Sequence, residues 1–306
     1  MSFAAIRARF SLKSVLVATD FSDASRQPLA HGLAVARHYG AKFYLAHVVS
    51  GFGYTLTGPD ALEAASGAAK RDLLQLEQQL VESGSLEGIE HESIVSKGVV
   101  WEELQSIISQ NHIDLVVLGT HGRRGVGRIV LGSVAEDVFR HANCLVLTVG
   151  PNSCTFDFGK TNLKFLFATD FGEGSLSALP HAISFANHLR AKLIFLHVVP
   201  IAPVPEHPSR DVLRMRDAAR VAYLRRLAQL LTNQEQEELA LPPEYLVHFG
   251  RPSETILQLA LKLKADLIFM GLRRSTHVAA APQTHWATAY EMVCGASCPV
   301  LTVRTQ

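Results

Sequence analysis

An internal repeat is the feature of this sequence that most restricts its fold. The tetrapeptide Ala-Thr-Asp-Phe occurs at residues 18–21 and again at residues 168–171. From Leu16 to Val49 the two copies stay in register at a spacing of 150 residues, and the closing segments CLVLTV (144–149) and CPVLTV (298–303) also correspond. Solenoid repeats have periods of only about 20–50 residues. The sequence therefore predicts two duplicated domains, residues 1–150 and 151–306.

Each copy alternates short apolar runs with longer stretches of helical periodicity. The run SVLVAT at residues 14–19 is nearly all apolar, which is typical of a strand buried on both faces of a parallel sheet. The strands expected by the same criteria are 14–19, 42–49, 90–96, 114–119 and 144–149, and then 164–169, 192–199, 244–249, 266–271 and 299–303. Helices are expected between them, for example at 22–39, 61–83, 99–111 and 133–141. This order predicts an α/β fold with a five-stranded parallel sheet in each domain, covered by helices.

Composition narrows the class of protein. The net charge of +1 gives no broad basic surface, so we expect no nucleic-acid partner. No apolar stretch approaches the roughly 20 residues that a membrane-spanning helix needs, and the N-terminal region lacks the apolar core of a secretory signal. The four cysteines form neither a CxxC pair nor a dense framework, so we expect no metal bound by cysteine and a reduced, cytoplasmic protein.

A glycine-rich segment follows the fourth expected strand of the first copy. It reads Gly119-Thr-His-Gly122, then nine residues, then Gly132-Ser133. Open α/β sheets bind ligands at the carboxyl ends of their strands, and glycine lets backbone N–H groups come close to a phosphate. A helix that begins at Ser133 would present the partial positive charge of its N-terminus. The pattern predicts a phosphate site, with added cations from Arg123, Arg124 and Arg128.

The same residues could instead have purely structural roles. Ser133-Val-Ala-Glu136 matches a capping box, which would account for Ser133 without any ligand. Gly119 and Gly122 could also serve only to shape a turn. Two further nucleotide motifs are excluded, because the sequence has neither GxxxxGK[ST] nor a GxGxxG after its first strand.

These residues together resemble the universal stress protein family. The resemblance rests on Asp20 after the first strand, on His47-Val-Val49, and on the Gly119-x2-Gly122-x9-Gly132-Ser133 motif followed by the strand 144–149. It covers nearly the whole chain, which looks like the tandem form with an ATP-binding motif in its first domain. The resemblance implies two Rossmann-like (adenine nucleotide alpha hydrolase-like) domains with strand order 3-2-1-4-5. It also implies ATP between the tips of strands one and four, accompanied by Mg2+ through oxygen ligands.

Matching the family motif position by position implies the residues that contact the nucleotide. The side chain of Asp20 would face the adenine or the ribose, Ala18 and Thr19 would line the base pocket, and the backbone of Val48 would contact the adenine. His121 is a candidate contact from its place beside the phosphate loop. The complete expected set is Ala18, Thr19, Asp20, Val48, Leu118, Gly119, His121, Gly122, Arg123, Gly132, Ser133 and Val134.

The second copy departs from this motif. Gly271 is followed by Leu-Arg-Arg, so Arg274 takes the place of the second glycine. Aligned backwards from the last strand, Trp286-Ala287 replaces Gly132-Ser133, and Thr288-x-x-Glu291 is expected to cap the helix instead. A Trp side chain would block a phosphate there. The sequence therefore predicts one nucleotide per chain, in the first domain.

Two further features have alternative interpretations. His47 and His197 occupy equivalent strands; we expect packed, hydrogen-bonded residues rather than catalytic ones, because no nucleophile or oriented acid accompanies them. The segment 210–226 could form an acidic-partner surface, but its interleaved aspartates and apolar residues favour a solvated amphipathic helix. Its arginines are Arg210, Arg214, Arg216, Arg220, Arg225 and Arg226.

The leading functional hypothesis is a cytoplasmic, ATP-binding regulator of the stress response, in which ATP orders the loop 122–132. The alternatives are a slow ATPase or phosphotransferase using the same pocket, which lacks an evident catalytic carboxylate, and a scaffold that binds no nucleotide. The family's last strand is also the one through which domains pair. The resemblance thus implies an intramolecular pseudo-dimer through 145–149 and 300–303, and leaves a homodimer open.

Overall fold

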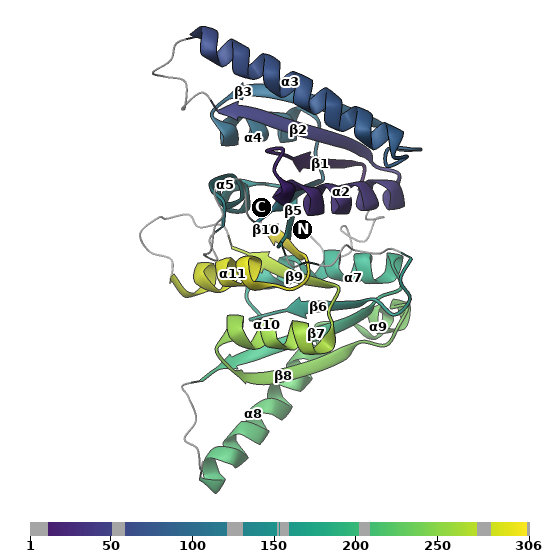
Figure 1. The fold of residues 1–306 in the computed structure, drawn as a ribbon. Coiled ribbons are helices and arrows are strands. Elements are labelled where there is room, and N and C mark those ends of the chain that lie inside the picture. The colour runs from purple at the N-terminus through teal and green to yellow at the C-terminus, as the bar shows by residue number, and fades with distance from the viewer. Residues whose placement is uncertain are drawn as a thin grey trace. The chain divides into compact units, whose positions relative to one another are not determined.

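Each half of the chain contributes five parallel strands to the fold (Figure 1). The computed structural model describes residues 12–50, 59–120, 131–151, 153, 159–201, 209–273 and 283–304. These residues divide into a first unit that ends at residue 153 and a second unit that begins at residue 159. Each unit is described by itself below.

The first unit confirms the expected element order to within a few residues. Its sheet has the order β3-β2-β1-β4-β5 with every neighbouring pair parallel, which is the order that the resemblance implied. In Figure 1, α2 and α3 cover one face of this sheet, and α4 and α5 cover the other. The elements are β1 Ser14–Ala18, the 3-10 turn η1 Asp23–Ser25, α2 Arg26–Tyr39, β2 Lys42–Ser50, α3 Pro59–Glu82, β3 His91–Gly98, α4 Val100–Gln110, β4 Leu115–Gly119, α5 Ser133–His141 and β5 Leu145–Val149.

The second unit repeats this plan with one extra helix. Its strands follow the order β8-β7-β6-β9-β10, again all parallel. The elements are β6 Lys164–Ala168, α6 Glu173–Ser177, α7 Leu179–His188, β7 Lys192–Pro200, α8 Arg210–Ala228, α9 Asn233–Glu238, β8 Glu244–Gly250, α10 Pro252–Leu263, β9 Leu267–Leu272, α11 Gln283–Gly295 and β10 Val300–Arg304. None of the helices in the described part of the chain is long and apolar enough to cross a bilayer.

The central strands supply the core, as their apolar runs predicted. Val15, Leu16 and Val17 of β1 are 0% exposed, because helices cover both faces of the strand. In the second unit the buried rings of Phe165 and Phe269, on neighbouring strands, have centroids 5.7 Å apart. Such buried aromatic pairs contribute both area and edge interactions to the core.

The two equivalent histidines are packed residues, as expected. Nδ1 of His47 lies 2.7 Å from the carbonyl oxygen of Thr19, and Nδ1 of His197 lies 2.8 Å from that of Thr169. A carbonyl oxygen only accepts, so Nδ1 carries the proton in both rings. The two histidines thereby fasten β2 and β7 to the ends of β1 and β6.

Burial makes the stability of the second unit sensitive to acid. Burial lowers the pKa of both His181 and His197 below the ordinary value of 6.5. Below about pH 6.5 the unfolded chain therefore binds more protons than the folded one. The free energy of unfolding should then fall on acidification by up to about 1.4 kcal/mol per pH unit for each histidine.

Urea unfolding between pH 7.5 and about pH 5.5 measures this slope. The chain has two tryptophans, so a Trp101→Phe background leaves Trp286 as the fluorescent probe of the second unit. In that background His197→Gln, whose amide can still donate to Thr169, should flatten the slope. An unchanged slope would show that His197 does not carry the effect.

Candidate functional site

The candidate site lies where β1 and β4 end side by side. Val17 of β1 pairs with Val117 of β4, so the two strands finish at the same level, after Ala18 and Gly119 respectively. From β1 the chain crosses to β2 on one side, whereas β4 leads to β5 on the other. Such a reversal of strand order leaves a crevice at the carboxyl ends of the strands, where open α/β sheets bind ligands.

Four expected residues from four different elements form an apolar wall at this crevice. Leu118 of β4 is 3% exposed and belongs to the core cluster beneath α4 and α5. Half-buried Ala18 of β1, Val48 of β2 and Val134 of α5 pack against the same cluster, as does Trp101 at the start of α4. A partly exposed apolar wall of this kind suits one face of a flat, apolar ring.

The start of α5 lies next to this wall and has no side-chain cap. The helix begins at Ser133, and its N-cap is Gly132 with φ −61° and ψ 148°, without a capping side-chain hydrogen bond. The capping-box interpretation of Ser133 is therefore wrong: Ser133 is the first helical residue, and the Glu136 carboxylate pairs with Arg140 at 2.7 Å. The first N–H groups of a helix have no intrahelical partner, so this end can receive an anion.

The two ends of the glycine-rich segment meet at the tip of β4. The Gly132 N–H donates to the carbonyl oxygen of Thr120 at 3.0 Å, and the Thr120 N–H donates to Val149 at 3.0 Å. Gly119 and Gly132 are thereby held near each other. His121, Gly122 and Arg123, together with Arg124 and Arg128, lie outside the described residues, so their expected roles stay predictions.

Asp20 has a role in the turn after β1. Its Oδ1 accepts hydrogen bonds from the Ser22 N–H at 3.0 Å, the Ser22 hydroxyl at 2.6 Å and the Ser25 hydroxyl at 2.7 Å. In the second unit Asp170 Oδ1 accepts equivalent bonds from Gly172 at 2.8 Å and Ser175 at 2.6 Å. Because the second copy lacks the glycine motif, this aspartate is accounted for in both units by the turn. Its contact with a nucleoside stays a prediction.

The equivalent crevice of the second unit is closed by backbone. A Cβ added to Gly271, at the end of β9, would lie 1.6 Å from the carbonyl oxygen of Gly174 and 2.7 Å from the Cα of Ser175. A Cβ on Gly174 would lie 2.9 Å from the backbone nitrogen of Arg273. The start of α6 thus rests directly on the tip of β9. In the first unit Ala24 occupies the position of Gly174.

The helix before the last strand also begins earlier in the second unit. α11 starts at Gln283, so Trp286-Ala287, aligned with Gly132-Ser133, lies inside the helix. The expected cap at Thr288 is therefore wrong, and Glu291 instead accepts a hydrogen bond from the Ser253 hydroxyl. N–H groups after the first four of a helix bond within it, so the backbone N–H groups of Ala287 and Thr288, aligned with those of Ser133 and Val134, are taken up inside α11.

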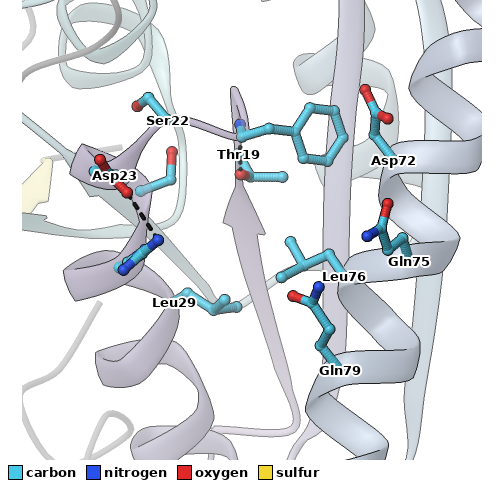
Figure 2. A pocket seen from close by; sticks show the side chains of 11 residues that line it. Thr19, Ser22, Asp23, Leu29, Asp72, Gln75, Leu76 and Gln79 are labelled. Carbon is cyan, nitrogen blue, oxygen red and sulfur yellow. Dashed lines mark hydrogen bonds and ion pairs between the residues drawn. The ribbon is translucent and has the colours of Figure 1, made fainter.

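A cavity that the sequence did not predict lies on the other face of the first sheet. It has a volume of about 260 Å³ and lies between α2 and α3 (Figure 2). Thr19 is the one member of the expected nucleotide set, as far as the structure describes that set, that lines it. The other lining residues are Phe21, Ser22, Asp23, Ser25, Arg26, Leu29, Asp72, Gln75, Leu76 and Gln79. Within the described ranges, no group of three or more His, Cys, Asp or Glu residues is arranged to hold a metal ion.

Comparisons with known proteins find relatives that match about half of the chain and others that match nearly all of it. A universal stress protein of Methanocaldococcus jannaschii is 30% identical over 138 residues, covering 45% of this chain and 81% of that protein. The crystal structure of a universal stress protein from Archaeoglobus fulgidus covers 96% of this chain and 97% of its own, with 20% identity and a TM-score of 0.66. A universal stress protein solved in complex with cAMP is 20% identical over 48% of this chain, with a TM-score of 0.35.

The family model for the universal stress protein family matches residues 11–150 and, separately, residues 162–304. The two matches correspond to the two copies of the internal repeat and to the two units of the structure. The chain therefore belongs to the universal stress protein family, in a tandem form.

Proposed function

We propose that the first unit binds one molecule of ATP with Mg2+, and that the chain acts as a nucleotide-dependent regulator of the stress response. One observation carries the proposal: the uncapped start of α5 lies beside a half-buried apolar wall at the tips of β1 and β4. The two features offer complementary chemistry. A helix N-terminus attracts phosphate, and an apolar wall accommodates a purine.

Within this proposal, different parts of the nucleotide would contact different parts of the site. The backbone N–H groups of Ser133 and Val134 would donate to phosphate oxygens, and the absence of a Cβ at Gly132 leaves room for them. Ala18 and Val48 would contact the base along the apolar wall. Gly122, Arg123 and His121 complete this proposal from the sequence motif alone.

Mg2+ fits this site as a companion of the triphosphate. Mg2+ keeps several waters and is commonly held by substrate phosphates together with one or two protein oxygens. A dedicated cluster of protein ligands is therefore not needed, and the described residues supply none. Bound Mg2+ would neutralise part of the phosphate charge, while the chain's own groups orient the nucleotide.

The described polar side chains near the site favour regulation over catalysis, because they already form hydrogen bonds within the protein. The His47 Nδ1–H donates to Thr19, and Asp20 Oδ1 already accepts three hydrogen bonds in its turn. ATP would act by stabilising the conformation of the first unit that binds it. A cytoplasmic location, pairing of β5 with β10, and a homodimer remain proposals that rest on the family resemblance.

Calorimetric titration of ATP-Mg2+ into nucleotide-stripped protein tests the proposal. We expect one site per chain, because backbone closes the crevice of the second unit. Absence of binding would contradict the proposal, and two sites per chain would contradict its restriction to the first unit. Sustained phosphate release that is lost in Asp20→Ala would support the slow ATPase in place of the regulator.

A further inference from the structure

The cavity between α2 and α3 differs in chemistry from the nucleotide site. Figure 2 shows Gln75, Leu76 and Gln79 reaching from α3 toward Thr19 and Leu29, with Asp72 at the upper end. The side walls are thus aliphatic and amide in character, and a carboxylate lies at the rim. Phe21 also lines the cavity.

The repeat shows what occupies the equivalent place in the second unit. The helices α3 and α8 share a register, because RDLLQL at 71–76 aligns with RRLAQL at 225–230. The buried leucines of the two segments, Leu73 and Leu227, are 2% and 0% exposed, which supports the alignment. In this register Asp72 of the first unit corresponds to Arg226 of the second.

The aromatic ring that lines the cavity also has a counterpart in the second unit. Phe21 and Phe171 each have φ of 61°, and their rings lie 4.4 Å from His47 and 4.6 Å from His197 respectively. In the second unit the guanidinium carbon of Arg226 lies 4.1 Å from the centroid of the Phe171 ring. A cation over an aromatic face is attracted by the ring quadrupole. The second unit therefore supplies its own guanidinium to this ring.

The first unit has the ring but has no cation at the position of Arg226. Its residue at the Arg226 position is the carboxylate of Asp72, with which no described residue forms an ion pair. Arg26 lines the cavity too, but its guanidinium pairs with Asp23 at 2.9 Å. The lining thus combines two carboxylates, one paired cation and an aromatic ring. This set attracts cations and disfavours anions.

We propose that this cavity is a second ligand site, which binds a small molecule carrying a guanidinium group. The guanidinium lies over Phe21, where the second unit places Arg226, and pairs with the Asp72 carboxylate. The side-chain carbonyls of Gln75 and Gln79 accept its remaining N–H groups, and a short aliphatic chain lies along Leu29 and Leu76. The site shares Thr19 with the nucleotide crevice but is independent of ATP.

Calorimetric titration of agmatine into nucleotide-free protein tests this proposal. We expect one site, weakened about tenfold by Asp72→Asn, because a charge-assisted pair is lost while the side-chain shape is kept. Glu82→Gln is the matched control: it removes a carboxylate from the same helix, outside the cavity, and keeps an amide beside Gln78. Agmatine affinity in Glu82→Gln should equal that of the unmodified protein.

Asp72→Arg gives a second test, because it installs the residue of the second unit and should abolish agmatine binding. An arginine capped at both ends, as in a peptide, serves as the second probe. If it binds more weakly than agmatine, the ligand is a free small molecule. If it binds more tightly, that assignment is overturned in favour of an arginine side chain of another protein. The proposal is overturned if agmatine fails to bind at about 10 mM, or if Asp72→Asn binds it as well as Glu82→Gln does.

Discussion

Gly132→Trp is expected to weaken ATP binding at least about 100-fold, because an indole at the N-cap of α5 displaces the phosphates from the helix start. Hydrogen bonds to charged groups contribute about 1.5–3 kcal/mol each, so losing two of them suffices for this effect. The backbone of Gly132, with φ −61° and ψ 148°, is one that other residues adopt readily. Loss of binding would therefore report on the side chain and not on a strained fold. Calorimetric titration with ATP-Mg2+ measures it.

The reciprocal change, Trp286→Gly, tests why the second unit is expected to bind no ATP: because of the Trp286 side chain or because of the backbone. If the Trp286 side chain alone blocked the second unit, then Trp286→Gly would open a second ATP site. We expect it to open none, because α11 begins at Gln283 and because Gly271 touches the backbone of Gly174. A stoichiometry of two in Trp286→Gly would refute closure by the backbone. Retained binding in Gly132→Trp would refute the assignment of phosphate to the start of α5.

The strands could be predicted because the apolar runs of the sequence and its internal repeat indicate the same segments. A run such as residues 14–19 is apolar at nearly every position, which a buried parallel strand requires and a surface helix does not. The repeat then supplied each strand twice, in two sequences that had diverged. The order 3-2-1-4-5 came from the resemblance to a family, and the strand pairings confirm it.

The helix starts could not be predicted from capping motifs alone. Ser133-x-x-Glu136 and Thr288-x-x-Glu291 both match a capping box, yet neither residue is an N-cap. A box motif is short and says nothing about where the chain enters a helix. In α11 an additional turn precedes Thr288, and Glu291 bonds to Ser253 on α10 instead. Contacts with a neighbouring helix are not encoded in the local sequence.

The closed crevice and the cavity depend on distances between segments far apart in the sequence. Nothing local to Gly271 indicates that it touches Gly174, almost 100 residues away. The internal repeat gave one weak indication of the cavity's chemistry. Aligning residues 71–76 with 225–230 shows that an aspartate, Asp72, stands where the second copy has Arg226. That change of charge becomes informative only when Phe171 is seen beneath the arginine. Among six arginines of one segment, nothing in the local pattern singles out Arg226.

Gly271→Ala is expected to destabilise the second unit by about 3 kcal/mol, at the upper end of what overpacking costs. The new Cβ would lie 1.6 Å from the Gly174 carbonyl oxygen and 2.5 Å from its carbon. Both are backbone atoms, so no change of rotamer relieves the contact. The tip of β9 and the start of α6 must move apart. Urea unfolding, followed by Trp286 fluorescence in a Trp101→Phe background, measures the free energy of unfolding of this unit.

Gly67→Ala in α3 is the matched control, because its Cβ would be 3.7 Å from the flexible guanidinium of Arg71. Alanine is favoured over glycine within a helix, so the first unit should gain up to about 1 kcal/mol, read from Trp101 in a Trp286→Phe background. If Gly271→Ala proved as harmless as Gly67→Ala, then α6 would not rest on β9. The second crevice would have room for a ligand, and the restriction of ATP to the first unit would lose its structural basis. The stability of one glycine variant therefore bears directly on how many nucleotides the chain can bind.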